Sequence, residues 1–337
     1  MYRAYYRLRR KPFDLLPDPK MVYMGEEHQE ALSMLRYGVL DNKDFLLLSG
    51  EVGTGKSTLL QVLLSSIEDQ HHICLLANPL ITLDDLYLYM ADSYGLPDFN
   101  DSRAKFLISF GKFLQGCAER DERVLLIVDE AHALSLKTLE EIRMLSNQPS
   151  CQGVFGIFLV GQPEINELLA TDRLRPLRQR ISLRFHLTPF NRQETDYYIR
   201  QRLLKAGGHN LDLFSPGAVD AIFQASGGTP RAINLLCDHA LLAGYSNDKT
   251  KITRQIIADV LPDIILPKVM APAPDPAEDP KASQQLQQAQ KEAAKKPESG
   301  AAAPPAAIKN KEPNVFIFIL IFFLGAISLY LLYSLYS

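Results

Sequence analysis

The sequence is poor in cysteine and has no paired cysteine motif. Its four cysteines are widely spaced along 337 residues, and none forms a C-x-x-C pair: Cys74, Cys117, Cys151 and Cys237. This spacing argues against a disulfide framework or a zinc site, so we expect reduced thiols in a cytosolic domain. The seven histidines also lack the spacing of metal ligands, because the adjacent pair His71 and His72 directs its two rings apart.

A strong excess of either charge is also missing. The formal net charge is −3 with 22% charged residues, so the overall electrostatics indicate no class of partner. The first eleven residues are a local exception, with five cations and no acid: Arg3, Arg7, Arg9, Arg10 and Lys11. We expect a solvated arm there, with contact to anionic lipid or nucleic acid as the alternative. The segment has no apolar stretch of the signal-peptide kind, so we expect no secretory leader.

One long uncharged apolar run lies near the C-terminal end. It reads VFIFILIFFLGAISLYLLY over residues 315–333, and a helix that crosses a bilayer needs about 20 such residues. Lys309 and Lys311 precede the run and no charged residue follows it, which predicts that the N-terminal part lies in the cytoplasm. We therefore expect a single transmembrane helix over residues 314–335 in a cell inner membrane, with no domain beyond it.

The segment before this run is rich in proline, alanine, glutamine, lysine and glutamate. Residues 263–313 contain APAPDPAEDP and GAAAPPAA and no aromatic residue. Such a composition cannot bury enough apolar surface to fold. We therefore predict a disordered linker over residues 263–313 that acts as a tether.

A glycine-rich loop lies between a short apolar run and an apolar helical segment. The run DFLLLS at residues 44–49 is typical of a buried strand, and the residues after it match G-x-x-x-x-G-K-[ST] in the strand–loop–helix context that the motif requires. We predict that Lys56 reaches the β- and γ-phosphates of ATP and that the Ser57 hydroxyl binds Mg²⁺. The predicted phosphate-binding residues are Gly50, Glu51, Val52, Gly53, Thr54, Gly55, Lys56, Ser57 and Thr58.

Two adjacent acids close a second apolar run. Residues 123–128 read RVLLIV, and Asp129 and Glu130 follow directly. Phosphoryl transfer to water needs a carboxylate for the metal ion and an acceptor that positions the water. We predict that Asp129 binds Mg²⁺ and that Glu130 orients the water.

Further candidates follow a third apolar run at residues 154–160. Gln162 is predicted to contact the γ-phosphate or the attacking water, with a turn residue as the alternative. The stretch of residues 172–181 holds four arginines just before the last strand. A neighbouring subunit receives an arginine finger from such a place, and we choose Arg180 first and Arg178 second. A solvated basic face is the alternative for this stretch.

After Pro189 the sequence becomes helical. The N-x-x-E pair of Asn191 and Glu194 predicts a helix start, and three further starts follow near residues 215, 229 and 253. We expect four short helices that form a small lid over residues 190–262. Arg231 lies in the first turn of the third helix, where a cation opposes the helix dipole. An anionic partner would offset that cost, so we predict that Arg231 touches the γ-phosphate.

Taken together, these motifs resemble the AAA+ ATPases of the general secretion pathway protein A (ExeA) family. The resemblance covers roughly residues 1–262 and rests on the tyrosines at residues 2–6 with Pro12 and Phe13, PDP at 17–19, GEVGTGKST, VDEAH, LVGQPE, LRQRI and GGTPRAIN. It implies an α/β fold, with an αβα P-loop core over residues 1–189 and a parallel sheet. It further implies ATP and Mg²⁺ as cofactors, assembly into homo-oligomers, and an adenine side lined by Pro12, Phe13 and Tyr23. Secretion-type members commonly carry a peptidoglycan-binding domain beyond the membrane, and we expect none in this protein.

Three functions compete at this point. The first is a membrane-anchored ATPase that assembles or remodels a membrane complex for secretion or type IV pilus biogenesis, with a membrane protein as its partner. The second is a membrane-tethered ATPase of transposition or defence that binds DNA, against which the slightly acidic net charge speaks. The third is an oligomeric scaffold that binds ATP and hydrolyses it slowly.

Overall fold

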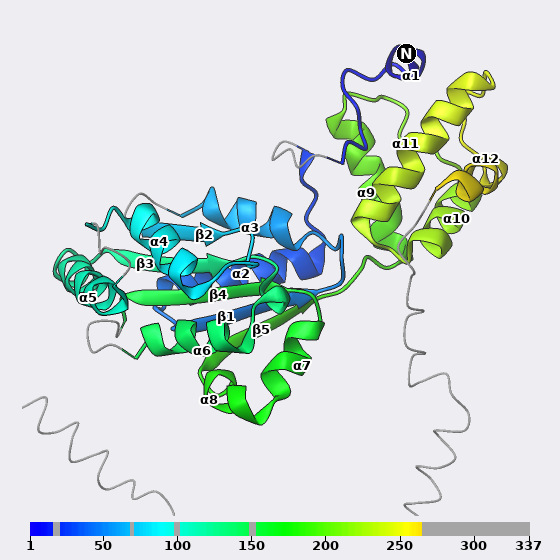
Figure 1. Cartoon of the computed structure of the whole chain (residues 1–337). Helices are drawn as coiled ribbons and strands as arrows, with labels where there is room; N and C mark the ends of the chain where they lie inside the picture. The colour runs from blue at the N-terminus through cyan, green and yellow to red at the C-terminus, as the bar shows by residue number, and fades with distance from the viewer. Residues whose placement is uncertain (16–20, 68–70, 98–101, 148–152, 265–337) are drawn as a thin grey trace, which may run out of the picture. The chain divides into compact units, whose positions relative to one another are not determined.

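The sheet predicted from the apolar runs is present at the centre of the chain. The computed structural model describes residues 1–15, 21–67, 71–97, 102–147 and 153–264 (Figure 1). In this part of the chain five parallel strands pair in the order β2-β3-β4-β1-β5. Their bounds are β1 Phe45–Gly50, β2 His71–Leu76, β3 Arg123–Val128, β4 Phe155–Gly161 and β5 Ile181–Leu187. Each residue of β1, β3 and β4 is buried, as expected of central parallel strands covered on both faces.

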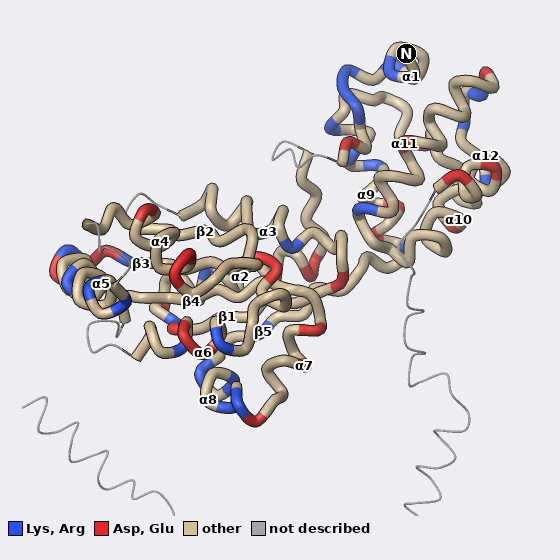
Figure 2. Tube along the Cα trace, in the orientation of Figure 1, with Lys and Arg blue, Asp and Glu red and all other residues tan. Residues whose placement is uncertain are grey.

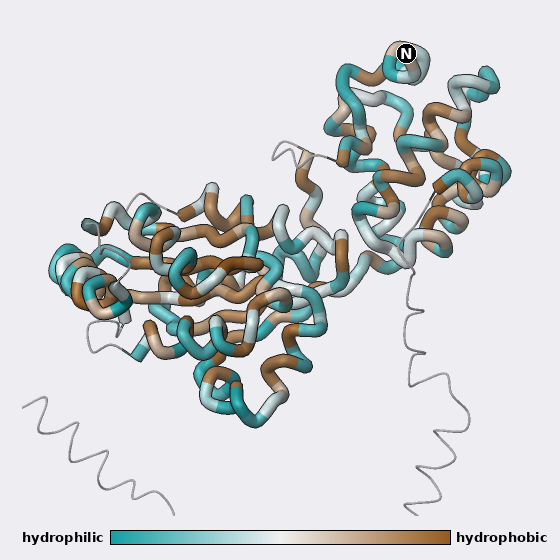
Figure 3. Tube along the Cα trace, in the orientation of Figure 1, coloured by the Kyte–Doolittle hydropathy of each residue, from teal (hydrophilic) through white to brown (hydrophobic). Residues whose placement is uncertain are grey.

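Successive residues of the central strands face opposite layers of helices. In β3, Val124 and Leu126 join one apolar cluster, whereas Leu125 and Ile127 join another. Figure 3 shows the apolar residues concentrated along these strands. One layer consists of α2 Glu26–Leu40 and α3 Lys56–Leu64; the other contains α4 Leu83–Tyr94, α5 Arg103–Glu119, α6 Leu136–Leu145, α7 Glu164–Ala170 and α8 Arg175–Arg178. The short 3-10 helices η2 Ala131–Ala133 and η4 Asp172–Leu174 complete the core.

The helices expected after Pro189 form a separate apolar cluster. Their bounds are α9 Arg192–Lys205, α10 Pro216–Ser226, α11 Pro230–Ser246 and α12 Arg254–Val260, followed by the 3-10 turn η5 Leu261–Asp263. The predicted pair Asn191 and Glu194 makes a complete capping box at the start of α9. Gly227 ends α10 in the left-handed conformation with φ 55°. We call these helices the lid.

The first residues pack on the lid and are not a solvated arm. Helix α1 Tyr2–Tyr5 and the residues after it contribute Tyr2, Leu8 and Phe13 to the lid cluster. The backbone N–H groups of residues 9 and 10 both donate to the carbonyl of Ala206, at 2.8 and 3.3 Å. Figure 2 shows that cations gather along this N-terminal segment. The expected solvated arm is therefore wrong, because the apolar side chains that alternate with the cations are buried and fix the backbone.

The predicted linker and membrane helix lie outside the described residues, apart from Asp263 and Ile264. The chain divides into two units, residues 1–272 and residues 273–337. Among the described residues, no helix combines the length and the apolar character that a membrane crossing requires. The domain limits at residues 189 and 262 therefore remain predictions.

Candidate functional site

The glycine-rich loop connects β1 to α3 in a conformation that glycine alone adopts without strain. Gly53 has φ 82° and Gly55 has φ 106°. A Cβ atom on Gly53 would lie 2.7 Å from the Cβ of Arg231, so the lid approaches the loop too closely for any side chain at this position. The glycines therefore serve both the curvature of the loop and its contact with α11.

Lys56 is buried at the start of α3, beneath the loop. Its Nζ donates to the carbonyl oxygens of Gly50 at 2.7 Å and Glu51 at 2.9 Å. Burial lowers the pKa of Lys56, while the nearby carboxylates of Glu130 and Asp129 act to raise it. A buried cation at a helix N-terminus creates a positive potential where the loop would meet phosphates.

The two predicted metal ligands lie together. The Ser57 hydroxyl donates to Oδ2 of Asp129 at 3.0 Å, although the two residues are far apart in the sequence. A hydroxyl and a carboxylate are hard oxygen donors of the kind that Mg²⁺ prefers. The residues present therefore fit Mg²⁺: Ser57 and Asp129 would hold the ion.

Glu130 and Gln162 also lie together, at the carboxyl ends of the neighbouring strands β3 and β4. The side-chain amide of Gln162 donates to Oε2 of Glu130 at 3.2 Å. Glu130 adopts the left-handed conformation with φ 52°, which turns the chain sharply as it leaves the sheet. Because of this turn, the Glu130 carboxylate contacts Gln162 while the Asp129 carboxylate contacts Ser57, so the two adjacent acids can have different roles.

The two arginines predicted as finger residues form hydrogen bonds with neighbouring groups of their own chain. Arg178 Nη1 donates to the carbonyls of Leu169 and Ala170 at 3.4 and 3.2 Å, and Arg180 Nη1 donates to the Ser146 hydroxyl at 2.8 Å. In the described part of the chain, neither side chain borders the cavity beside the loop. A role in a neighbouring subunit stays a prediction for both.

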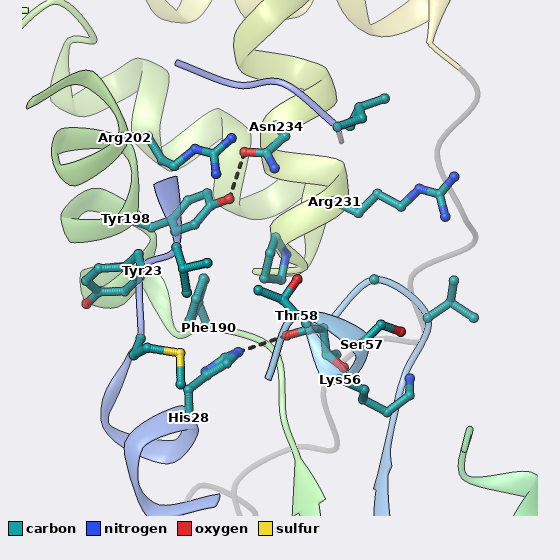
Figure 4. A pocket seen from close by; sticks show the side chains of 18 of the residues that line it. Tyr23, His28, Lys56, Ser57, Thr58, Phe190, Tyr198, Arg202, Arg231 and Asn234 are labelled. Atoms are coloured by element: carbon teal, nitrogen blue, oxygen red, sulfur yellow. Dashed lines mark hydrogen bonds between the residues drawn. The ribbon is translucent and has the colours of Figure 1, made fainter. Parts of the chain in front are cut away.

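A cavity of about 360 Å³ lies between the loop, the lid and residues 14–15 and 22–28, within the usual size range of ligand pockets. Arg231 lines it on the loop side, with its backbone N–H donating to the Gly53 carbonyl at 3.3 Å (Figure 4). The other side is largely aromatic, and of its residues only Tyr23 was expected from the family resemblance. The lining residues that sequence reasoning missed include His28, Phe190, Tyr198, Arg202 and Asn234.

The aromatic side of the cavity is built from three contacting rings. Tyr23, Phe190 and Tyr198 have ring centroids 5.2 to 5.8 Å apart. The Tyr198 hydroxyl donates to Oδ1 of Asn234 at 2.8 Å, in a buried position. Tyr23 thus lines the cavity as the resemblance implies. Phe13 does not border it, because it is buried in the lid against Phe214.

His28 joins the core helix α2 to the loop. Its Nε2 lies 2.9 Å from the Thr54 carbonyl, and its ring packs against Phe190. Burial lowers the pKa of His28. A neutral imidazole with an N–H on Nε2 can donate to that carbonyl and support the loop from below.

Arg202 attaches the N-terminal segment to the lid. This buried guanidinium donates to three backbone carbonyls, those of Pro12 at 2.6 Å, Asp14 at 3.0 Å and Met21 at 3.2 Å. It also lies over the Tyr198 ring at 5.7 Å. A single side chain thus orders the backbone that leads to the aromatic side of the cavity.

We expect Arg202→Ala to release residues 2–13 from the lid. Charge-assisted hydrogen bonds contribute about 1.5–3 kcal/mol each, so the hydrogen-exchange protection of the Arg9 and Arg10 amides should fall at least about 100-fold. The matched control is Arg200→Ala, two residues away in the same helix, which removes ion pairs with Asp196 and Asp212. Such partly exposed pairs contribute little, so the control should keep this protection within about threefold. Equal losses in both variants would contradict the role of Arg202.

A second cluster of metal-binding residue types lies away from the loop. Donor atoms of His72, Cys117 and Glu122 lie within 4.8 Å of one another. The Arg120 guanidinium contacts the Glu122 carboxylate at 2.7 Å and, followed by His72, lowers the pKa of Glu122 to about 2. Burial raises the pKa of the Cys117 thiol to about 11. A protonated thiol and a carboxylate already held by a cation indicate a structural cluster.

Comparison with protein families gives a match to a family described as an AAA domain, over residues 39–169. General secretion pathway protein A of Aeromonas hydrophila is 39% identical over 254 residues, which is 75% of this chain and 46% of that protein. An uncharacterized HTH-type transcriptional regulator of Methanocaldococcus jannaschii is 22% identical over 144 residues, 42% of this chain and 35% of that protein. The chain thus spans less than half the length of both curated relatives.

Solved structures share the fold at low sequence identity. Cdc6p of Pyrobaculum aerophilum has a TM-score of 0.55 at 18% identity, over 71% of this chain and 67% of that one. The ORC2 protein of Aeropyrum pernix has 0.55 at 15% identity, over 75% and 71%. Drosophila ORC, in a structure bound to DNA, has 0.56 at 15% identity, over 77% and 65%. These likenesses concern the fold alone.

Proposed function

Because this chain is an AAA+ P-loop ATPase related to general secretion pathway protein A, we propose that it hydrolyses ATP to assemble or remodel a membrane complex. We place it at the inner membrane, held by the helix predicted over residues 314–335, with the ATPase part in the cytoplasm. Its partner is a membrane protein of a secretion or pilus system. The relationship to the secretion protein supports this choice among the functions open to the fold.

The observation that carries the proposal is the convergence at the end of the loop. Lys56 is buried there, Ser57 bonds to Asp129, and Glu130 bonds to Gln162. Three separate segments therefore bring a cation, a pair of metal-binding oxygens and the Glu130 carboxylate, with Gln162 as its partner, to one place. A phosphate-binding protein without turnover would not need that carboxylate.

Each residue then has a role in phosphoryl transfer. Lys56 and the loop N–H groups bind the phosphates, while Ser57 and Asp129 hold Mg²⁺, which neutralises developing charge when bound. Glu130 orients the attacking water, and Gln162 positions Glu130 or the γ-phosphate. Arg231 approaches the γ-phosphate from the lid, and Arg180 or Arg178 completes the site of a neighbouring subunit.

The assay that tests the proposal is the specific ATPase activity of residues 1–272 at increasing protein concentration. This fragment is the first of the two compact units of the chain. We expect the activity per subunit to rise at least about tenfold, because an arginine supplied between subunits is worth roughly 10³–10⁵ in turnover. Arg180→Ala should remove the rise. The matched control is Arg173→Ala, which removes an exposed ion pair with Glu140 and should keep it.

Duplex DNA at low salt separates the second function from the first. We expect the ATPase rate to be the same with and without DNA. A rise in rate with DNA that added salt abolishes would favour the DNA-binding ATPase, because phosphate contacts are salt-dependent. A turnover that stays very slow at every concentration would instead favour the nucleotide-gated scaffold.

A further inference from the structure

His132 lies between the two side chains that are proposed to act on water. It belongs to η2, directly after Glu130, and its side chain is only 19% exposed. Gly161 at the end of β4 allows this close approach. A Cβ atom there would lie 3.2 Å from the His132 backbone nitrogen and 3.5 Å from its Nδ1. The imidazole is therefore seated against the strand that carries Gln162.

Both ring nitrogens of His132 face groups of the site. Nδ1 lies 3.3 Å from the backbone nitrogen of Gln162 and 3.5 Å from Oε2 of Glu130. Nε2 lies 3.0 Å from the side-chain amide nitrogen of Gln162. The same amide nitrogen lies 3.2 Å from Oε2 of Glu130. The amide of Gln162 is thus shared between His132 and Glu130.

A neutral imidazole has one donor and one acceptor, so these contacts cannot all be satisfied at once. If Nε2 accepts from the Gln162 amide, Nδ1 carries the proton. Nδ1–H can then donate to Glu130. However, the backbone N–H of Gln162 also points at Nδ1, so two donors face each other without an acceptor between them. The amide of Gln162 then bonds to the carboxylate as well, and Glu130 is held.

In the other tautomer Nδ1 accepts from the Gln162 backbone N–H, and Nε2 carries the proton. The Nε2–H group needs an acceptor, which the Gln162 amide offers only when it rotates to present its oxygen. An amide oxygen in that position repels the Glu130 carboxylate and no longer donates to it. The Gln162 amide, which has two N–H donors, therefore bonds to both His132 and Glu130 in the first tautomer, and to His132 alone in the second.

We propose that His132 is a positioning residue whose tautomer decides whether Gln162 bonds to Glu130. With Gln162 bonded to Glu130 the carboxylate is held; with Gln162 turned to His132 the carboxylate is free to orient water. This inference rests on the proposed ATPase function and assigns His132 a role in it. The role acts through Gln162 and Glu130, without contact between His132 and the nucleotide.

The test is a double-mutant cycle on kcat in the full-length protein. His132→Phe keeps a ring of similar size and removes both nitrogens, so Gln162 stays on Glu130. We expect kcat to fall about tenfold, roughly the effect of one hydrogen bond, while the dissociation constant for ATP stays within about twofold. In a Gln162→Ala background, where the shared amide is gone, His132→Phe should have no further effect. His132→Gln, which offers a donor and an acceptor, should recover part of the rate.

If the kcat losses of His132→Phe and Gln162→Ala multiplied in the double variant, the proposal would be overturned, because the effects of independent residues add in free energy. An unchanged kcat in His132→Phe would overturn it too, as would a kcat fall accompanied by a comparable loss of ATP binding. These failures differ from failure of the proposed function. In that case the unmodified protein would show no Mg²⁺-dependent turnover, or Glu130→Gln would keep it, and the role of His132 would fall as well.

Discussion

Glu130→Gln is expected to lower kcat for ATP hydrolysis by about 10²–10⁴-fold, the usual contribution of a positioned acid–base group. Glutamine has the same shape but cannot accept the proton of the attacking water as a carboxylate does. The dissociation constant for ATP should change by less than about threefold, because phosphate binding depends on the loop and on Lys56. The measurement is single-turnover hydrolysis together with binding of a fluorescent ATP analogue.

The matched control for this variant is Glu164→Gln, at the start of α7. It removes the same charge near the site, since both carboxylates act on the pKa of Lys56. We expect its kcat to stay within about threefold of the unmodified protein. If both variants lost the same activity, the loss would come from the electrostatic field, and Glu130 would not be the group that orients water.

The core of the molecule could be predicted because its signals are local. Three apolar runs indicated β1, β3 and β4 within one residue of their observed bounds; the first leads into the loop that carries Lys56, and the second leads directly into Asp129. The carboxyl ends of parallel strands meet at one edge of the sheet, so motifs that follow different strands come together there. This explains why Ser57 and Asp129, which were chosen as Mg²⁺ ligands from motifs after different strands, lie in contact.

The aromatic side of the cavity could not be predicted, because its residues have no pattern of their own. Arg202 lies in α9 among other charged residues, and only the fold shows that it is buried beneath the N-terminal backbone. Gly228 lies between the end of α10 and the start of α11. In the structure a Cβ atom at this position would lie 1.8 Å from the Phe190 carbonyl, so the glycine also allows the contact where the chain enters the lid. Contacts of this kind between distant segments produce no recognisable residue spacing in the sequence.

The N-terminal segment shows how a strong local signal can mislead. Five cations in eleven residues predicted solvation, yet the same segment holds Tyr2 and Leu8, which are buried in the lid. Burying these side chains is worth about 1.5–3 kcal/mol each, while the cations remain at the surface at little cost. A charged sequence can therefore belong to a packed element when its apolar residues find a common face.

Lys56→Ala is expected to weaken ATP binding at least about 30-fold, and hydrolysis should be lost with it. The Nζ atom is buried and already bonded to the carbonyls of Gly50 and Glu51, so the cation is held in place before phosphate arrives. Removing one partner of a buried charge pair typically costs 2–5 kcal/mol, which corresponds to a factor of about 30 to 5,000 in affinity. Isothermal titration with a non-hydrolysable ATP analogue measures this change directly.

The control for Lys56 is Lys43→Ala, which removes a lysine just before β1. Lys43 pairs with Asp41 at 2.6 Å and is partly exposed, so its loss should leave ATP affinity within about twofold. Burial lowers the pKa of Lys56 more than the nearby carboxylates raise it, so burying this cation is unfavourable, and the apo protein should lose little stability or gain some when the lysine is removed. A stable Lys56→Ala variant that no longer binds ATP would show that Lys56 serves ATP binding. A variant that is less stable but keeps its affinity for ATP would show that Lys56 serves the stability of the fold.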